Sequence, residues 1–386
     1  MAAAGTGRIQ VSLDPISPGA ATDELLAAIL RANPRVSDLI FSPGKKFQIQ
    51  VNGEFVELDM PGLPPLTADD TRRVASDLIA SNKAAISMLR EQGYCDVSHA
   101  LPGVARFRVN IFIQRGSCAV VMRVIPTTIP DFRGLGLPEQ LRDIAQLHDG
   151  LVLIIGPRGS GKSSTLAALL DHINETRTCH IITIEDPIEF LHNHKRSTVH
   201  QRELHSDTPS VLQALRAALR QAPNVIAVGE LKDPQTMELA LEATETGHLV
   251  LSTMNTINAQ QAVERFISVL PAGDHRPGRD RLSRMLRYVI SQRLVPRKQD
   301  EHRTAVFEVW KSGPESLEKL LRHNAQRPDK ESPGDNPERQ PEHNDDGSID
   351  SQIEDLVRSG VVSPEIAVIH ATDPRTLAKK LGITER

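Results

Sequence analysis

In residues 151–164 the pattern of a buried strand is followed directly by a glycine-rich turn and then by the start of a helix. The apolar run at 151–155 (LVLII) is typical of a strand that is covered on both faces of a parallel sheet. The turn that follows fits the phosphate-binding pattern G-x-x-x-x-G-K-[ST], and a helical pattern begins directly after it. A chance glycine-rich turn would lack this strand and this helix. The stretch therefore predicts a site for a nucleoside triphosphate.

The residue types of this turn suit a polyanion. Glycine removes the Cβ atoms that would keep a phosphate away from the backbone, so successive N–H groups can point into one concavity. The helix N-terminus behind the turn adds partial positive charge. Lys162 is expected to reach the β- and γ-phosphates, and the hydroxyl of Ser163 is expected to hold Mg²⁺. The predicted binding residues are Gly156, Pro157, Arg158, Gly159, Ser160, Gly161, Lys162, Ser163 and Ser164.

Two acidic clusters follow apolar runs downstream of the turn. Glu185 and Asp186 come after the run IITI, and Glu230 comes after the run VIAVG. Because parallel sheets bind ligands at the carboxyl ends of their strands, Glu230 is the candidate carboxylate for Mg²⁺. Glu185 and Asp186 are either catalytic groups or structural partners of their neighbours. His248, just before another apolar run, is either a contact of the γ-phosphate or an ordinary structural hydrogen-bonding residue.

Length and composition limit the class of protein. A chain of 386 residues is long enough for two domains and an appendage. The three isolated cysteines offer neither a disulfide framework nor a C-x-x-C zinc site, which is typical of a reducing cytosol. The amino terminus lacks the pattern of a signal peptide, and no apolar run approaches the ~18 residues of a membrane span. The net charge of −4 gives no indication of nucleic-acid binding, so we expect no nucleic-acid partner and only peripheral membrane association.

Residues 21–125 predict a mixed α+β domain with an antiparallel sheet. Thr67 has the form of a helix N-cap followed by acids in the first turn, and Asn52-Gly53 is a hairpin signal. Strands are expected at 38–41, 47–51, 55–58, 106–113 and 118–125. Residues 1–20 are expected to form a flexible N-terminus, and proline and glycine mark a linker at 126–138.

Residues 139–310 predict a second, α/β domain, because strand patterns alternate there with helical ones. Strands are expected at 151–155, 180–184, 224–228 and 248–252, and helices at 210–221 and 235–246. A further amphipathic helix is expected from Asp280 to Leu294. Its basic stripe of Arg281, Arg284 and Arg287 we interpret as a solvated surface.

The last part of the chain predicts an appendage. Residues 311–325 have a helical pattern, and 326–348 have the composition of a disordered acidic insert. Residues 349–386 predict short helices, the third of which begins at Asp373-Pro374.

The order of these motifs resembles the type II/IV secretion ATPase superfamily, and most closely its PilT-like twitching-motility ATPases, which retract type IV pili. The likeness lies in GPRGSGKSSTLAALLDHIN (156–174), IITIEDPIEFLH (181–192), LRQAPNVIAVGELKDPQTMELAL (219–241) and ATETGHLVLSTMNT (243–256). It continues in ARFRVNIFIQRG (105–116), RVIP (123–126) and the tail at 355–382. These motifs occur in the order that the family has.

The resemblance implies a PAS-like N-terminal domain, a RecA-like P-loop ATPase domain, and ATP with Mg²⁺ as cofactors. By position, Lys162 and Ser163 belong to Walker A and Glu230 is the Walker B acid near Mg²⁺. Glu189 falls where the family has its general base, and His248 is the first histidine of the His box, near the γ-phosphate. The family also brings N-domain arginines to the nucleotide. The candidates, each of which can equally pair with a carboxylate, are Arg106, Arg108, Arg115 and Arg123.

The resemblance further implies a homo-hexameric ring that works at the cytoplasmic face of the inner membrane. There it would act on a pilus platform protein, with a paralogous pilus ATPase as a further candidate partner. ATP would open and close the two domains against each other and so drive pilus retraction.

The chain departs from the family pattern at two places. Asn255 stands where the family has the second His-box histidine, and SLEKLLR (316–322) with the charged insert replaces a helical motif linked to retraction. An accessory or low-turnover paralogue of the retraction motor is therefore one alternative. Another is a pilus-extension or type II secretion ATPase, although those relatives usually carry a four-cysteine zinc module that is not found here. A nucleic-acid translocase lacks support, since no basic arm or aromatic-interleaved patch is present.

Overall fold

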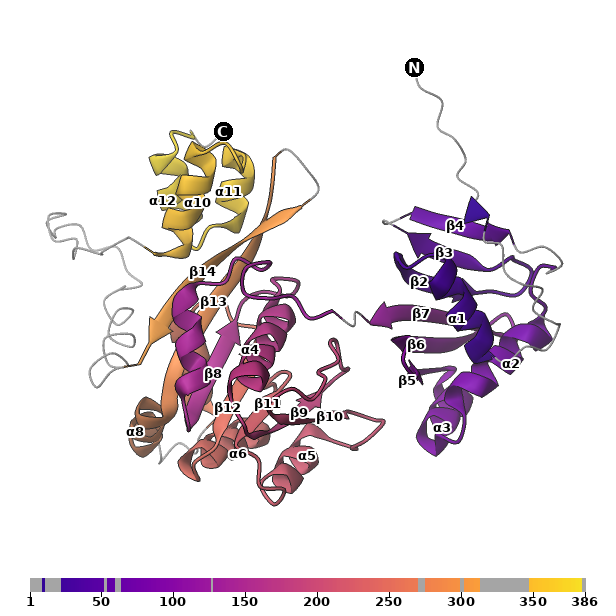
Figure 1. The fold of residues 1–386 in the computed structure, drawn as a ribbon. Coiled ribbons are helices and arrows are strands. Elements are labelled where there is room, and N and C mark those ends of the chain that lie inside the picture. Colours follow the sequence, from indigo (N-terminus) through magenta and orange to yellow (C-terminus); the bar gives the residue numbers. More distant parts are fainter. Residues whose placement is uncertain are drawn as a thin grey trace, which may run out of the picture. The chain divides into compact units, whose positions relative to one another are not determined.

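A computed structural model describes residues 9–10, 22–51, 54–59, 64–125, 128–269, 275–298, 302–312 and 347–383 (Figure 1). Within these residues the chain forms two compact units, each built around one sheet. The first unit runs to Thr128 and includes Pro187–Leu191 and Glu203–Pro209, and the second holds the remainder. The predicted Asn52-Gly53 hairpin signal, the stretch at 313–325 and nearly all of the acidic insert lie outside the described residues.

The first unit consists of a mainly antiparallel sheet with helices packed on it. Among its described residues the strand order is β1-β4-β3-β2-β7-β6-β5, and only the β1–β4 pair is parallel. The strands are β1 (Ile9–Gln10), β2 (Val36–Phe41), β3 (Gln48–Val51), β4 (Glu54–Asp59), β5 (Tyr94–Leu101), β6 (Ala105–Gln114) and β7 (Ser117–Ile125). The helices are α1 (Thr22–Ala32), α2 (Ala68–Ile79) and α3 (Lys83–Gln92). Buried and less buried residues alternate along β6, as expected where one face of a sheet packs on a core.

The start of α2 confirms the predicted N-cap. The hydroxyl of Thr67 accepts a hydrogen bond from the N–H of Asp70 (3.1 Å), and the carboxylate of Asp70 accepts one from the N–H of Thr67 (2.9 Å). These hydrogen bonds lower the pKa of Asp70 below its usual value. The reciprocal pair satisfies two N–H groups that a helix end would otherwise leave without partners.

The second unit is a mainly parallel α/β sheet, which confirms the predicted fold class. Its described strands run in the order β10-β9-β11-β12-β8-β13-β14, and the β13–β14 pair is antiparallel. The strands are β8 (Gly150–Ile155), β9 (His180–Glu185), β10 (Thr198–Glu203), β11 (Val225–Val228), β12 (Leu249–Met254), β13 (Leu286–Pro296) and β14 (Arg303–Lys311). The helices of this α/β part are the 3-10 helix η1 (Glu139–Gln146) and the α-helices α4 (Lys162–Thr176), α5 (Val211–Ala218), α6 (Pro234–Glu245), α7 (Ala259–Ser268) and α8 (His275–Met285).

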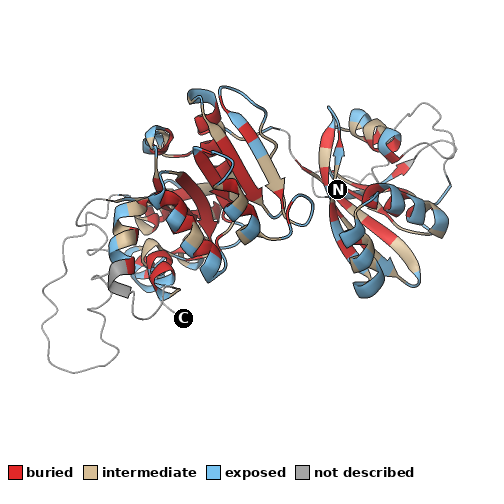
Figure 2. Cartoon of the chain, turned by 90° about the horizontal axis from the view of Figure 1, so that it is seen from below, coloured by how far each residue is buried: buried red, intermediate tan, exposed pale blue. Residues whose placement is uncertain are grey.

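Strand β8 is buried on both sides of this sheet. Leu151, Leu153 and Ile155 belong to the core shared with α5, α6 and α7, whereas Val152 and Ile154 belong to the core shared with α4 and η1. Figure 2 shows the strands of this sheet buried along much of their length. Burial of each such side chain stabilises the fold by about 1.5–3 kcal/mol, so an uninterrupted apolar run is required here.

The predicted helix from Asp280 to Leu294 is wrong. Helix α8 ends at Met285, and the chain continues as β13, which pairs with β8 on one side and β14 on the other. The three-residue spacing of the arginines favoured a helix, but the segment after Met285 is rich in β-branched residues that are buried in the sheet. Strands β5, β10 and β14 were also not predicted, and neither was β1, which lies within the residues 1–20 that were expected to be flexible.

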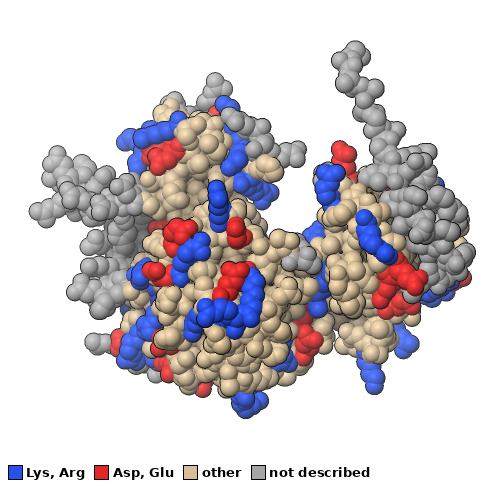
Figure 3. All heavy atoms as spheres, in the orientation of Figure 1, with Lys and Arg blue, Asp and Glu red and all other residues tan. Residues whose placement is uncertain are grey.

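The basic stripe does not form a single helix face, because Arg287 lies in β13. Arg281 makes a two-pronged ion pair with Glu245 (2.8 Å for each contact), and Arg287 pairs with Asp149 (2.5 Å). Hydrogen bonds from Arg281 lower the pKa of Glu245. On the face of the second unit seen in Figure 3, acidic and basic side chains are interspersed.

The C-terminal helices cover the β13–β14 hairpin. The predicted short helices are confirmed as α10 (Ile349–Arg358), α11 (Pro364–His370) and α12 (Pro374–Lys380). Ile353 packs with Val295 and Val306 of the hairpin. The side-chain amide of Gln352 donates to the carbonyl of Phe307 (2.5 Å) and accepts from its N–H (3.1 Å), so it pairs with β14 as another strand would. No helix in the described part of the chain has the length and apolar character needed to cross a membrane.

Removal of the buried contact at Ile353 is predicted to loosen the C-terminal helices. Ile353→Ala should cost about 2–4 kcal/mol because it leaves a cavity, and hydrogen exchange over 349–380 should accelerate. Ile369→Ala is the matched control, since Ile369 lies on the neighbouring helix with a side chain that is 77% exposed. Equal exchange rates in the two variants would contradict the packing of these helices on the hairpin.

Candidate functional site

The carboxyl ends of four neighbouring strands bring the predicted groups of the second unit to one edge of its sheet. In the order β9-β11-β12-β8, Val228 is paired with Ile184 and with Ser252, and Met254 is paired with Ile155. Glu185 is the last residue of β9, and the glycine-rich turn, Glu230 and Asn255 follow the ends of the other three strands. This is the edge at which open α/β sheets bind ligands.

Glycine at two positions allows the turn to pass close to β13. Gly161 has a φ of +87°, and a Cβ atom there would lie 2.8 Å from Nε2 of Gln292. A Cβ atom at Gly156 would lie 2.7 Å from Oγ of Ser160 and still closer to the carbonyl oxygen of Gln292. The path of the turn therefore requires glycine at both ends.

Lys162 is the first residue of α4, and its side chain folds back on the turn. Its Nζ donates to the carbonyl oxygens of Gly156 (2.9 Å) and Pro157 (2.8 Å), and the residue is 9% exposed. Oγ of Ser160 is buried without a hydrogen-bond partner among the described residues. A buried ammonium group and an unused hydroxyl within a glycine-lined turn fit a phosphate chain. The donor set for Mg²⁺ would be the hydroxyl of Ser163 and the carboxylate of Glu230, which are the oxygen ligands that Mg²⁺ prefers.

Glu230 is held by two neighbours at the sheet edge. Its Oε1 accepts a hydrogen bond from the side-chain amide of Asn255 (2.5 Å), and its Oε2 lies 3.4 Å from Nζ of Lys232. The backbone around it is fixed by the bond from the N–H of Leu231 to the carbonyl of Thr253 (3.0 Å). The carboxylate is thus oriented by β12, the strand next to β8.

Glu185 is part of a hydrogen-bonded chain at the end of β9. Its Oε1 accepts from the hydroxyl of Thr183 (2.5 Å) and from the amide of Gln201 (3.0 Å), whose own oxygen accepts from the N–H of His192 (2.8 Å). Asp186 is exposed. Glu185 therefore orders the segment that follows β9, which agrees with the structural alternative left open by the sequence.

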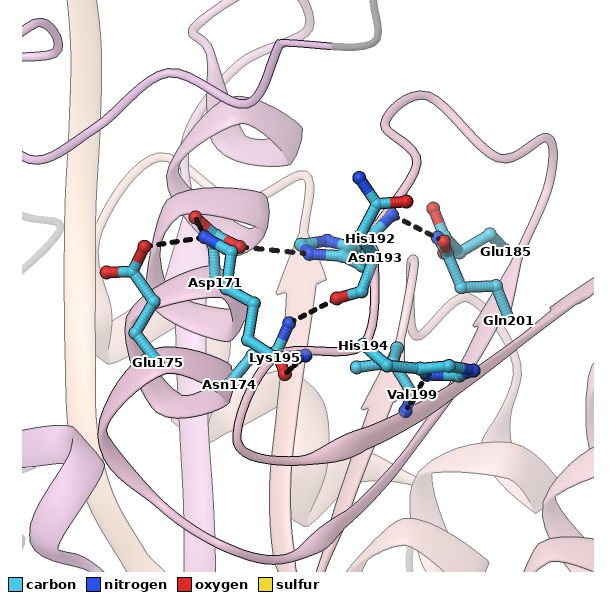
Figure 4. A network of polar contacts seen from close by, with 10 residues as sticks. All are labelled: Asp171, Asn174, Glu175, Glu185, His192, Asn193, His194, Lys195, Val199 and Gln201. Carbon is cyan, nitrogen blue, oxygen red and sulfur yellow. Dashed lines mark hydrogen bonds and ion pairs between the residues drawn. The ribbon is translucent and has the colours of Figure 1, made fainter. Parts of the chain in front are cut away.

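A group of polar residues joins this segment to α4 (Figure 4). Lys195 pairs with Asp171 (2.8 Å) and Glu175 (2.5 Å) on the helix. The side-chain amide of Asn174, which is fully buried, donates to the carbonyl of Asn193 (2.7 Å) and accepts from the N–H of Lys195 (3.2 Å). Burial of Lys195 acts to lower its pKa, but the hydrogen bonds to the two carboxylates outweigh this and raise it. Helix α4 starts at the glycine-rich turn of residues 156–161 (the phosphate turn, after its predicted ligand), and it is thus tied to the segment after β9.

His192 lies inside this group with a 3% exposed side chain. Its Nδ1 faces Oδ1 of Asp171 at 3.9 Å, and neither atom has a hydrogen-bond partner within the described residues. Burial lowers the pKa of His192, although the nearby Asp171 acts in the opposite direction. The buried ring is therefore neutral near pH 7.

His248 does not reach the phosphate turn of its own chain, contrary to the expectation. It precedes the first residue of β12, where its carbonyl accepts from the N–H of Gly150 (3.1 Å), whereas the turn follows the last residue of β8. The length of the strand, at about 3.3 Å per residue, separates the two ends by roughly 20 Å. Nδ1 of His248 donates to the carbonyl of Ala243 (2.9 Å), so the ring caps the end of α6.

The remaining predicted residues belong to the first unit. Glu189 is exposed in the segment Pro187–Leu191. Arg106 donates to Glu203 (3.0 Å) and Arg123 to Asp38 (2.9 Å), so both pair with carboxylates of this unit. Arg108 and Arg115 are exposed, and Arg115 adopts a φ of +48° in the turn between β6 and β7.

Some residues of the site were not found from the sequence. The contact between Asn255 and Glu230 joins residues that only the pairing of β11 with β12 brings together. Gln292 lies far along the chain, in a segment that the sequence predicted as helix. No local pattern signals either contact.

Comparisons with known proteins agree with this geometry. A family model described as "Type II/IV secretion system protein" matches residues 89–331. The chain is 38% identical over 330 residues to a twitching motility protein of Neisseria gonorrhoeae, with 86% of this chain and 85% of that protein covered. It is 41% identical over 301 residues to the type IV pilus retraction ATPase PilT of Pseudomonas aeruginosa, with 78% and 85% covered. A crystal structure of the pilus retraction motor PilT with bound ADP is similar, with a TM-score of 0.79, 35% identity, and 92% and 99% covered.

Protonation of His192 is predicted to destabilise the second unit. The unfolded chain takes up this proton near the ordinary pKa of 6.5, and the folded chain does so only at lower pH. The stabilising contribution of the neutral ring is therefore complete above pH 6.5 and is lost as the pH falls through the folded pKa. His192→Asn should reduce the fall in unfolding temperature between about pH 7 and about pH 5. His148→Asn, at an exposed site, is the control; parallel curves for wild type and His192→Asn would contradict the prediction.

Proposed function

The chain belongs to the type II/IV secretion system protein family, and on that premise we propose that it is an ATP-hydrolysing motor that retracts type IV pili and so powers twitching motility. One observation carries the proposal. The phosphate turn and the Walker B carboxylate Glu230 share one sheet edge in a chain that matches a pilus retraction ATPase over most of its length.

The proposed chemistry assigns a role to each group at this edge. Backbone N–H groups of the turn and Lys162 bind the phosphates, and Lys162 exchanges its two carbonyl acceptors for phosphate oxygens. Ser163 and Glu230 hold Mg²⁺, which when bound neutralises developing phosphate charge. Asn255 keeps Glu230 oriented. Glu189 is the proposed general base, by its place in the motif.

Mechanical work would come from a difference in affinity between two arrangements of the domains. ATP favours a closed arrangement through contacts of its γ-phosphate with Lys162 and N-domain arginines. Arg106 and Arg123 are engaged in ion pairs, whereas Arg108 and Arg115 are exposed and form no ion pair with the described residues. Hydrolysis removes these contacts, so the closed arrangement loses its advantage and the domains open. In a homo-hexamer such steps would turn a platform protein at the cytoplasmic face of the inner membrane and extract pilin subunits.

An accessory paralogue with low turnover is the second candidate, and Asn255 is the residue that raises it. Asparagine cannot titrate as histidine does, but its amide donates the hydrogen bond that orients Glu230. This geometry favours a competent ATPase. Measurement of ATP turnover by the chain alone and beside a paralogous pilus motor separates the two candidates: turnover that requires the paralogue favours the accessory role.

Loss of either key group at the sheet edge is predicted to stop hydrolysis. Lys162→Ala should abolish ATP binding because it removes the buried ammonium group, and Glu230→Gln should retain binding but lower kcat by at least about 100-fold because it removes the charge opposite Mg²⁺. Phosphate release and nucleotide binding are measured on purified protein. Lys45→Ala is the control, since Lys45 is exposed and its 3.6 Å pairing with Glu57 is a surface ion pair. Full turnover by Lys162→Ala would remove the site assignment.

Deletion of the gene is predicted to leave cells with excess surface pili and without twitching motility. A retraction motor that is absent cannot withdraw pili that continue to extend. Complementation with wild-type protein should restore motility, whereas Lys162→Ala at the same expression level should not. Cells without pili would instead support the pilus-extension alternative.

A further inference from the structure

Gln292 of β13 lies against the phosphate turn, although no sequence motif marks it. The residue is 3% exposed, and it follows Ser291, which is paired with Ile155 at the end of β8. Gln292 therefore stands beside Gly156, where the turn leaves the sheet. Its carbonyl oxygen occupies space that any side chain at Gly156 would need.

The side-chain amide of Gln292 also contacts the other end of the turn. Its Nε2 lies 2.8 Å from the position that a Cβ atom of Gly161 would occupy. Its Oε1 accepts a hydrogen bond from the hydroxyl of Thr165 (2.7 Å), which is fully buried in the first turn of α4. One residue of β13 thus touches both ends of the phosphate turn and the helix that follows it.

We propose that Gln292 is a positioning residue for ATP binding and hydrolysis. Its buried amide, fixed by Thr165, sets the spacing between the end of β8 and the start of α4, and so sets where the turn and Lys162 meet the phosphates. A buried hydrogen bond between two side chains is sensitive to loss of either partner, because the other is left unsatisfied. Displacement of a binding loop by an ångström is sufficient to cost a large factor in affinity and rate. The inference rests on the proposed function in one respect, namely that this turn holds ATP.

The role makes a prediction that a merely structural residue does not. If Gln292 acts through the turn, its loss should weaken the binding of nucleotides, and the loss of affinity should grow with the number of phosphates. The affinity for adenosine should stay unchanged. Gln292→Met should raise the Kd for Mg-ATP about tenfold and raise KM with a smaller fall in kcat. Gln292→Glu retains the acceptor for Thr165 but places a negative charge beneath the turn, so its effect on ATP should exceed that of Gln292→Met.

The partner residue provides a second route to the same test. Thr165→Val removes the hydroxyl and should weaken the binding of Mg-ATP to a similar degree, whereas Thr165→Ser keeps the hydroxyl donor and should keep the affinity. If the two residues act as a unit, Thr165→Val combined with Gln292→Met should bind Mg-ATP no more weakly than the worse single variant. Gln352→Met is the matched control, since Gln352 is a glutamine of the same unit that bonds to β14 instead of the turn.

The outcomes separate this inference from the function on which it rests. The full chain is titrated with ATP, ADP, AMP and adenosine, and its unfolding temperature is measured alongside. The graded loss in Gln292→Met, with Gln352→Met binding as wild type, supports the inference. Wild-type ATP affinity in Gln292→Met, or an equal loss for adenosine and ATP, overturns it even when Lys162→Ala abolishes binding. If Gln292→Met does not fold, wild-type affinity in Thr165→Val overturns the inference instead. Retained binding in Lys162→Ala overturns the site assignment itself.

Discussion

Parallel pairing of β8 between β12 and β13 is the constraint on which the second unit depends. The pairing buries β8 on both faces, which explains its uninterrupted apolar run, and it places the chain's exit from the strand beside the end of β12 and beside Ser291 in the middle of β13. One neighbour supplies Asn255, which orients Glu230, and the other supplies Gln292, which supports the phosphate turn. The composition of the site therefore follows from the strand order.

Local chemistry could be predicted from the sequence, whereas contacts across the sheet could not. The strand, turn and helix at 151–165 are specified by residues adjacent in the chain, as is the cap at Thr67. The segment after Met285 was misassigned because the predicted helix from Asp280 was extended through it to Leu294, and only pairing with β8 and β14 makes it a strand. His248 was misplaced because its role near the γ-phosphate was carried over from the motif to which it belongs, although its place at the start of an expected strand puts it opposite to the carboxyl edge of the sheet.

The polar residues of the second unit contribute differently according to their burial. Arg281 and Arg287 form ion pairs at the surface, where each contributes about 1 kcal/mol or less. Asp171 and Asn174 of α4 instead bind the segment after β9. Asp171 pairs with Lys195, and the buried Asn174 satisfies the carbonyl of Asn193 and the N–H of Lys195. Helix α4 is thus fixed at its first turn by Gln292 and along its later turns by this group. Its position, and with it that of Lys162, is determined from both ends.

Strand β13 also connects the phosphate turn with the C-terminal helices. Adjacent residues of a strand point to opposite faces, and here Gln292 contacts the turn while Arg293 donates to the carbonyl of His370 at the end of α11. Arg293 is 6% exposed, and burial lowers its pKa, while the nearby Asp350 and Glu308 favour its charge. The glycine-rich turn and the end of α11 therefore both rest on β13, through two residues that are adjacent in the strand.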